Sequence, residues 1–227
     1  MLRLLSLLLV VPLVSGCVGD DVPTVALLVA DEDAGSATID VAAFTERVEE
    51  ACRECEVEVY DAGGDAAEQA SQARQAVNAE SDVVLVWPVE PDAVEGIVPE
   101  EVPVVSLVTL VPGSDRFVGL ATGEPEAAEQ GSDLEGAREL VLGKRRSMTY
   151  VPTRAMSEQA ADVVVGQLAG TSVPGGEEHE GVTSWLYDTT EVTLDDLTTV
   201  LVGEGVITLE ELCAGRTAAR CQRFGLR

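Results

Sequence analysis

The sequence predicts an α/β fold in which helices cover both faces of a parallel sheet. Two observations lead to this prediction. Short apolar runs alternate along the chain with stretches in which apolar residues recur at helical spacing. Several of these runs are apolar at every position, as expected for strands that are buried on both faces. The right-handed crossover rule then leaves a doubly wound sheet as the simplest topology.

Apolar runs of strand length mark the predicted sheet. The first run begins after Pro23 and ends before an acidic cluster at 31–33, and the third run ends at Pro88. The predicted strands are 24–29, 57–60, 83–87, 102–108 and 117–120.

Helices are predicted between these strands. Val41, Phe44 and Val48 recur at helical spacing with acidic residues between them, which is typical of an amphipathic helix. Residues 66–78 follow a glycine-containing turn and predict an alanine- and glutamine-rich helix. The remaining patterns predict a short helix at 92–98, helices at 125–142 and 156–168, a strand at 148–151, a loop at 171–180 that exposes His179, and two short helices in a tail from 194 onward.

The N-terminal segment has the features of an export signal. Arg3 supplies one positive charge, and an almost unbroken apolar stretch follows. This stretch is shorter than the roughly 20 apolar residues that a membrane span needs. It ends in Val14-Ser15-Gly16-Cys17, which resembles the lipobox of bacterial lipoproteins. We therefore expect a signal peptide at 1–16 and a lipid on Cys17 that anchors the protein to the outer face of the cell membrane. In the alternative, the signal is an ordinary secretory one and Cys17 is a bystander.

The chain is strongly acidic, with 41 acidic and 14 basic residues and a formal net charge of −27. Binding to nucleic acid depends on cations that neutralise phosphates, so the sequence predicts no nucleic-acid partner. We attribute the charge to salt adaptation or to the general acidity of an exported protein, rather than to a specific cation site.

Four cysteines remain once Cys17 carries a lipid. An even number in an oxidising compartment predicts two disulfides. Three connectivities are possible, and spacing favours the local pairs Cys52–Cys55 and Cys213–Cys221. A zinc site built from all four is the alternative. A redox site is disfavoured because Cys52 follows a predicted helix and does not begin one.

Candidate ligand contacts lie beyond the carboxyl ends of the strands, where doubly wound sheets bind ligands. An acidic loop follows the first strand, Trp87 ends the third, and hydroxyl side chains lie at the end of the fourth. An indole face can stack on a sugar ring, although a lone tryptophan is more often packing, and an acidic loop is more often only solvated. The predicted contacts are Asp31, Asp33, Trp87, Ser106 and Thr109.

The residues needed for catalysis are scarce. His179 is the only histidine and has no nucleophile beside it, and Ser106 lacks the context of a nucleophile elbow. Gly63-Gly64 lacks the lysine and the spacing of a phosphate-binding loop, and no calcium-loop spacing occurs. The sequence therefore predicts a protein that is not an enzyme and has no cofactor and no metal site.

Three segments resemble the solute-binding lipoproteins of sugar ABC importers, in particular the xylose-type branch of the ribose-binding family. The first is Glu50-Ala51-Cys52-Arg53-Glu54-Cys55-Glu56-Val57, and the second is the Gly64-Asp65-Ala66-Ala67 turn with the helix after it. The third and most specific runs from Val192 through Ile207-Thr208-Leu209-Glu210-Glu211-Leu212-Cys213 to Cys221. The resemblance covers most of residues 24–227.

The resemblance implies a type I periplasmic-binding-protein-like fold, in which two similar lobes close over a sugar, and it implies both local cysteine pairs. The first lobe looks complete, and Ser147-Met148-Thr149-Tyr150 is similar to the segment that returns to it. Most of the second lobe is missing. The predicted domains are a signal peptide at 1–16, a lipidated linker at 17–23, an α/β lobe at 24–170 with a second-lobe remnant at 121–147, and a loop and disulfide-closed tail at 171–227.

Two departures from the family concern its sugar contacts. The family's Asp-Arg pair after the fourth strand corresponds to Val108 and Thr109, and a later Asp-Asn pair corresponds to Ala121 and Thr122. Charged bidentate groups give sugar sites much of their selectivity, so we expect weak or altered ligand binding.

The leading functional prediction is a lipid-anchored extracytoplasmic solute-binding-type protein related to sugar ABC transporter components. Its expected partners are a monosaccharide and the membrane subunits of an ABC importer or a sensor. The alternative is a degenerate accessory lipoprotein that binds a protein partner in place of transport.

Overall fold

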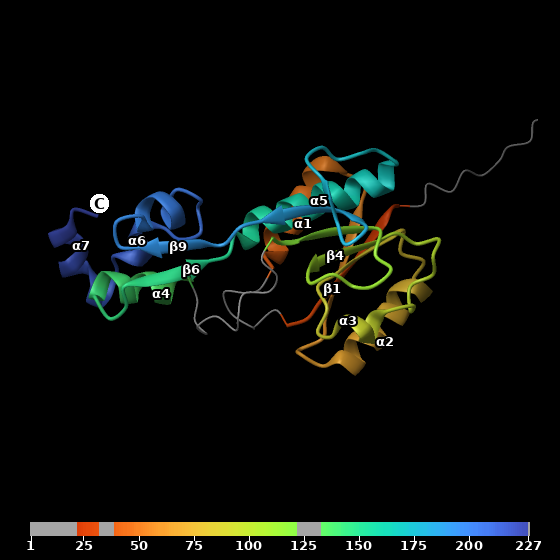
Figure 1. The fold of residues 1–227 in the computed structure, drawn as a ribbon, viewed down its shortest axis with the longest axis horizontal. Helices are drawn as coiled ribbons and strands as arrows, with labels where there is room; N and C mark the ends of the chain where they lie inside the picture. The colour runs from red at the N-terminus through yellow and green to blue at the C-terminus, as the bar shows by residue number, and fades with distance from the viewer. Residues whose placement is uncertain (1–21, 32–38, 122–132, 227) are drawn as a thin grey trace, which may run out of the picture.

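A computed structural model gives the fold of residues 22–31, 39–121 and 133–226. A large lobe built on a seven-stranded sheet and a small lobe built on a two-stranded sheet lie end to end along the long axis (Figure 1). The predicted signal peptide, Cys17 and Asp33 lie outside the described residues.

The sheet of the large lobe has the strand order β2-β1-β3-β4-β5-β8-β7. Neighbouring strands are parallel, except that β7 is antiparallel to β8. Val25 of β1 lies opposite Val57 on one side and Val83 on the other, so the order reverses around the first strand as in a doubly wound sheet. The strands are β1 (Thr24–Val29), β2 (Glu56–Asp61), β3 (Val83–Val86), β4 (Val104–Val108), β5 (Arg116–Leu120), β7 (Glu177–His179) and β8 (Val182–Tyr187).

Helices cover both faces of this sheet, which confirms the predicted fold class. Helices α1 (Val41–Ala51) and α5 (Thr153–Ala169) lie on one face, and α2 (Ala66–Asn78) and α3 (Pro91–Val94) lie on the other (Figure 1). Aspartate side chains begin two of them: Asp40 accepts a hydrogen bond from the backbone of α1, and Asp65 accepts two from the backbone of α2.

Alternate side chains of the apolar strands point into two different cores, one on each face of the sheet. Val25, Leu27 and Val29 belong to the cluster under α1 and α5, while Ala26 and Leu28 belong to the cluster under α2 and α3. All five side chains are fully buried. Burial of each valine or leucine side chain contributes about 1.5–3 kcal/mol, which explains why β1 is apolar at every buried position.

The small lobe is built from two separate parts of the chain. Strand β6 (Ser147–Tyr150) pairs antiparallel with β9 (Thr190–Thr193). Buried Leu140, Val192, Leu201 and Leu212 share its core. Its helices are α4 (Asp133–Leu142), the π-helix η1 (Thr198–Val202), α6 (Leu209–Leu212), the 3-10 helix η2 (Gly215–Thr217) and α7 (Ala218–Phe224).

Both predicted disulfides are present. Cys52–Cys55 closes the turn between α1 and β2, with the Cα atoms 5.4 Å apart. Cys213–Cys221 joins the end of α6 to α7, with the Cα atoms 5.7 Å apart. The second disulfide fastens the C-terminal helix to the core of the small lobe, where Cys221 is buried.

The region after α5 differs from the sequence prediction. The predicted loop at 171–180 contains strand β7, and no strand was predicted where β8 inserts beside β5. His179, predicted to be exposed in a loop, is partly buried and stacks on Phe117 with the ring centroids 6.0 Å apart. The pairing with β8 fixes the loop as a strand because it satisfies the backbone groups of 177–179.

The chain also crosses between the lobes at other places than predicted. Strand β6 lies in the small lobe, and α5, which follows it, packs on α1 in the large lobe. The return to the large lobe therefore comes after Tyr150, and the chain leaves again after Tyr187. The structure thus divides the chain differently from the predicted 24–170 lobe and 171–227 tail.

Asp133 makes the small lobe sensitive to pH. Burial raises the pKa of this carboxyl to about 6, above its ordinary value of 3.8. The folded state therefore favours the protonated carboxyl. The free energy of unfolding falls as the pH rises from about 4 through about 6, because the carboxyl ionises less readily in the folded state than in the unfolded state. We predict that Asp133→Asn raises the free energy of unfolding by about 1–2 kcal/mol at pH 8, with a smaller gain at pH 4, in urea denaturation.

The control for this prediction is Asp195→Asn, which removes an exposed carboxylate from the same lobe. This substitution should change stability by less than about 0.5 kcal/mol at either pH. Equal stability of Asp133→Asn and the unsubstituted protein at pH 8 would contradict the effect ascribed to burial.

Candidate functional site

The carboxyl ends of the parallel strands face the small lobe. Strands β5 and β8 are adjacent and parallel, and β8 leads through Asp188 and Thr189 directly into β9 of the small lobe. The other parallel strands run in the same direction, so their carboxyl ends meet at the same edge. The order reverses between β1 and β3, which is where doubly wound sheets bind ligands. The candidate site is therefore this edge of the sheet and the face of the small lobe opposite it.

Asp31 lies at the switch point, directly beyond β1, and is partly exposed. The strand end before it is tied to the neighbouring turn, because Gly64 donates its backbone N–H to the Ala30 carbonyl at 2.7 Å. Gly63 and Gly64 both have positive φ, a conformation that glycine adopts without strain. This tight turn holds the end of β1 in place. Asp33, the other acidic residue predicted as a ligand contact in the loop after β1, lies outside the described residues.

Trp87 lies at the end of β3 but is 9% exposed and packs in the core under α1 and α5. The ring therefore supports the strand end and leaves little surface for a ligand. Its backbone is held by Gln69 of α2, a fully buried side chain that the sequence analysis did not single out. The Gln69 amide donates to the Trp87 carbonyl at 2.8 Å and accepts from the Val89 N–H at 2.7 Å.

The end of β4 forms a strained turn. Val108 has φ +68°, which is an outlier for a β-branched residue, and the Thr109 N–H donates to the Leu107 carbonyl at 2.8 Å. A hydrogen bond between residues two apart, with a positive φ at the residue between them, defines a γ-turn of the rare type. Backbone strain of this kind costs about 1–3 kcal/mol and is found mostly at functional sites. The turn presents Thr109, partly exposed, at the edge that faces the small lobe.

Ser106 is fully buried, and its hydroxyl is used inside the protein. It forms a short hydrogen bond with the Ser114 hydroxyl and accepts from the Val111 N–H at 3.0 Å. These bonds hold the loop between β4 and β5 against the sheet. The hydroxyl of Ser106, which the sequence analysis predicted as a ligand contact, is therefore bonded within the protein.

Tyr187 is a further aromatic residue at this edge that sequence reasoning missed. It is the last residue of β8, and its carbonyl accepts from the Ala121 N–H at the end of β5, at 2.9 Å. Burial raises the pKa of its phenol, with Asp162 and Glu158 adding to the effect, so the hydroxyl stays protonated at neutral pH. The run Val182–Tyr187 could have indicated it, since it is rich in the aromatic and β-branched residues that are typical of strands.

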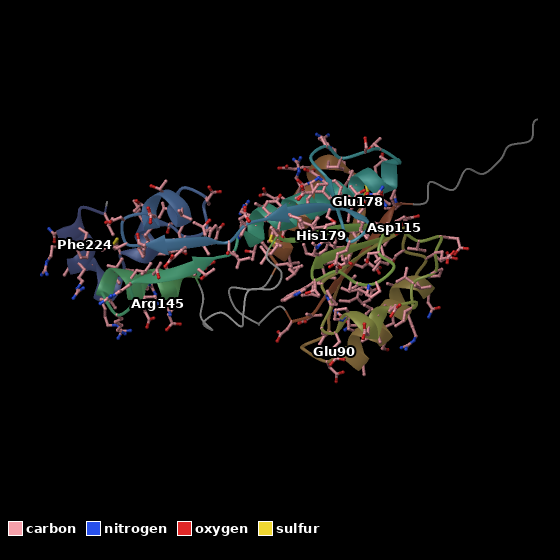
Figure 2. All side chains as sticks on the ribbon, in the orientation of Figure 1. Glu90, Asp115, Arg145, Glu178, His179 and Phe224 are labelled. Atoms are coloured by element: carbon pink, nitrogen blue, oxygen red, sulfur yellow. A yellow bond between two sulfur atoms is a disulfide. The ribbon has the colours of Figure 1, made fainter. Side chains whose placement is uncertain are left out.

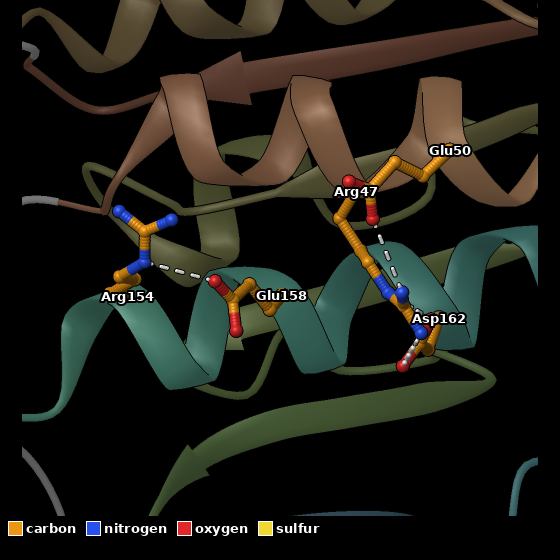
Figure 3. A network of polar contacts seen from close by, with 5 residues as sticks. All are labelled: Arg47, Glu50, Arg154, Glu158 and Asp162. Atoms are coloured by element: carbon orange, nitrogen blue, oxygen red, sulfur yellow. Dashed lines mark hydrogen bonds and ion pairs between the residues drawn. The ribbon is translucent and has the colours of Figure 1, made fainter. Parts of the chain in front are cut away.

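Tyr187 also lines a groove of about 400 Å³ between α1 and α5. Figure 3 shows the ion pairs in this groove. Arg47 binds Asp162 with two hydrogen bonds, at 2.8 and 3.2 Å, and reaches Glu50 at 3.4 Å. The bidentate pair joins the two helices and raises the pKa of Arg47, chiefly through its hydrogen bond to Asp162. The charged side chains that line the groove pair with one another, so we assign the groove a structural role.

No group of three or more histidine, cysteine, aspartate or glutamate side chains that could hold a metal ion occurs in the part of the chain that the structure describes. Within the same ranges, no helix is long and apolar enough to cross a membrane.

Comparison with solved structures finds the same fold in sugar-binding proteins. An ABC transporter solute-binding protein from Clostridium phytofermentans, solved with β-D-glucose, matches with a TM-score of 0.67 and 9% identity over 83% of this chain and 99% of that one. A carbohydrate transporter solute-binding protein from Chloroflexus aurantiacus, solved with D-glucose, matches with a TM-score of 0.60 and 11% identity over 84% and 97%. The complex of the TorS sensor domain with TorT matches with a TM-score of 0.57 and 10% identity over 77% and 95%. No protein-family description and no curated protein matches the chain.

These matches establish the type I periplasmic-binding-protein fold that the sequence resemblance implied. The alignments cover 83% and 84% of this chain, so they include residues of both its lobes. The low identities restrict the likeness to the fold. The roles of Asp31, Thr109 and the other predicted contacts stay predictions.

Gln69 provides a test of how the site edge is held. We predict that Gln69→Leu lowers the free energy of unfolding by about 2–3 kcal/mol, because it leaves the Trp87 carbonyl and the Val89 N–H without their partner. Gln75→Leu, at an exposed position of the same helix, is the control and should change stability by less than about 0.5 kcal/mol in urea denaturation. Equal effects of the two substitutions would show that the hydrogen bonds of Gln69 do not stabilise this edge of the sheet.

Proposed function

We propose that this protein is an extracytoplasmic solute-binding protein that holds a small polar ligand, most simply a monosaccharide, between its two lobes. The observation that carries the proposal is the set of six parallel strands whose carboxyl ends face a second lobe, in a fold shared with glucose-binding transporter proteins. These neighbours are binding proteins by name, which supports a binding role over catalysis.

The proposed contacts come from the large lobe. Asp31 accepts hydrogen bonds from ligand hydroxyls at the switch point, and Thr109 adds a hydroxyl at the end of β4. Asp33 belongs to the same proposed set, although it lies outside the described residues. The Trp87 side chain is too buried to stack on a sugar with more than its edge.

Binding should be weaker than in a protein with two full lobes. The small lobe has only a two-stranded sheet, and Val108 and Thr109 stand at the end of β4, at the positions that correspond to the family's Asp-Arg pair. Affinity depends on how much ligand surface is buried and on how well polar groups are paired. We therefore expect a dissociation constant in the micromolar range or above.

The proposed partners are the membrane subunits of a sugar ABC importer or a sensor. The TorS–TorT complex among the structural neighbours supports a protein partner of the second kind. A lipid on Cys17, as the lipobox-like segment predicts, would hold the protein at the membrane next to such a partner.

Isothermal titration of the chain from residue 18 onward against pentoses and hexoses tests the binding proposal. We predict saturable heat with one of these sugars, and a loss of affinity of about tenfold or more for Asp31→Asn, because a carboxylate binds hydroxyls more strongly than an amide. Glu101→Gln is the matched control, since this exposed residue precedes β4 at the opposite edge of the sheet. A folded protein that gives no heat with any of the sugars would refute sugar capture and leave the accessory protein that binds a protein partner.

Cys17→Ser tests the anchor. We predict that the unsubstituted protein, expressed in a bacterium that processes lipoproteins, fractionates with membranes and has an N-terminal mass increased by a diacylglyceryl group. The Cys17→Ser variant should carry no lipid and should leave the membrane fraction. Release of both proteins into the soluble fraction would instead identify an ordinary secretory signal.

A further inference from the structure

Cationic side chains gather at the far end of the small lobe. The turn after α4 lies against α7, because the Arg220 guanidinium donates to the Val141 carbonyl at 3.4 Å and lies close to Gly143. Figure 2 shows blue nitrogen atoms around this end, where Arg145 and Phe224 are labelled. We name this surface the cationic tip, and it consists of Lys144, Arg145, Arg146, Arg216, Arg220, Arg223 and the ring of Phe224.

The tip is opposite in charge to the rest of the molecule. Neither 140–150 nor 212–226 contains an acidic residue, although the whole chain has 41 acidic and only 14 basic residues. Glu139, just before the turn, pairs with Arg145 at 3.1 Å and with Lys144 at 4.0 Å. Arg146, Arg216 and Arg223 are exposed, so the tip keeps a positive surface in spite of this carboxylate.

An aromatic side chain stands among these cations. Phe224 ends α7 and is 45% exposed, whereas Cys221 on the inner side of the same helix is 2% exposed and forms the disulfide. The inner side fastens the helix to the core, and the outer side presents arginines with a phenylalanine. Cations together with an exposed aromatic ring are the combination that binds at the surface of an anionic bilayer.

We propose that the cationic tip binds an anionic phospholipid surface, with the arginines at the headgroups and the Phe224 ring at the boundary of the acyl chains. An electrostatic contact of this kind needs no pocket, which suits the outer end of an elongated molecule (Figure 1). The acidic large lobe does not cancel it, because charges are screened over about 8 Å at physiological ionic strength.

The geometry gives this contact a consequence for orientation. Strand β1 begins at Thr24, at the edge of the large lobe that faces away from the small lobe, and the tip lies at the opposite end of the molecule. A protein held near β1 by a lipid on Cys17 and at the other end by the tip lies along the membrane. The tip itself acts without the lipid, so the two contacts can be tested separately.

The test uses protein without residues 1–17 and vesicles of phosphatidylcholine alone or mixed with phosphatidylglycerol. We expect co-sedimentation with the anionic vesicles at physiological ionic strength, little with neutral vesicles, and loss of binding at about 1 M salt, where the screening length falls to about 3 Å. The double variant R216E/R223E should bind the anionic vesicles at least about tenfold more weakly.

The matched control R53E/R74E makes the same change in net charge at exposed positions of the large lobe, and it should bind as the unsubstituted protein does. Phe224→Ser should weaken binding severalfold, whereas Val59→Ser, at a position 41% exposed in the large lobe, should not. Circular dichroism and thermal unfolding confirm that each variant is folded.

Several outcomes would overturn the proposal. These are no binding to anionic vesicles, equal binding to neutral ones, and equal losses for R216E/R223E and R53E/R74E. Capture of the unsubstituted protein by immobilised polyglutamate, without any vesicle binding, would also overturn it and would point to an acidic protein surface as the partner of the tip. None of these results depends on whether the protein binds a sugar.

Discussion

The parallel pairing of β5 with β8 is the constraint on which the two-lobed structure depends. It places Val118 opposite Trp185 and joins the strand ends through the bond from the Ala121 N–H to the Tyr187 carbonyl. Trp185 is 6% exposed, packs in the core under α1 and α5, and donates its indole N–H to the Pro174 carbonyl at 2.9 Å. Through this pairing β8 becomes part of the large lobe, and the chain then continues into β9 of the small lobe. The small lobe is therefore built from two segments that each leave the same sheet.

The parts of the fold that local patterns determine could be predicted from the sequence. The helix at 66–78 has an aspartate cap, a uniform composition and a glycine turn before it, and the structure has α2 at the same residues. Strand β8 was missed because its place depends on a pairing with β5, which lies more than sixty residues earlier. A short strand that follows a long helix carries no local sign of the strand beside which it will insert. The assignment of this region to a tail followed from the lack of such a sign.

The site was only partly predictable because side-chain direction alternates along a strand. Asp31 and Thr109 lie beyond strand ends, and the topology alone places them at the ligand edge. Ser106 lies inside β4 between Val105 and Leu107, which are fully buried on the other face of the sheet, and its hydroxyl bonds to the loop that follows. Gln69 could not be told from Gln72 and Gln75 of the same helix, since only the packed sheet shows which of them reaches the end of β3. The positive φ of Val108 is equally unpredictable, because a β-branched residue disfavours it.

The contacts of α5 decide where the two lobes can move relative to each other. This helix begins three residues after β6, but the Arg47–Asp162 pair and the buried residues Ala160 and Val164 fix it to the large lobe. Movement of the small lobe is therefore not passed along α5. Between described elements the lobes are joined by the short links between Tyr150 and Thr153 and between Tyr187 and Thr190, and we expect these two links to take up part of such a movement. The first link contains Pro152, whose φ is fixed by its ring, and the Thr153 N–H donates to the Val151 carbonyl at 2.8 Å. Among the described residues, the link of Asp188 and Thr189 contains no proline and makes no backbone hydrogen bond of this kind, so we expect the strand connection to allow more rotation of the small lobe than the connection at Pro152.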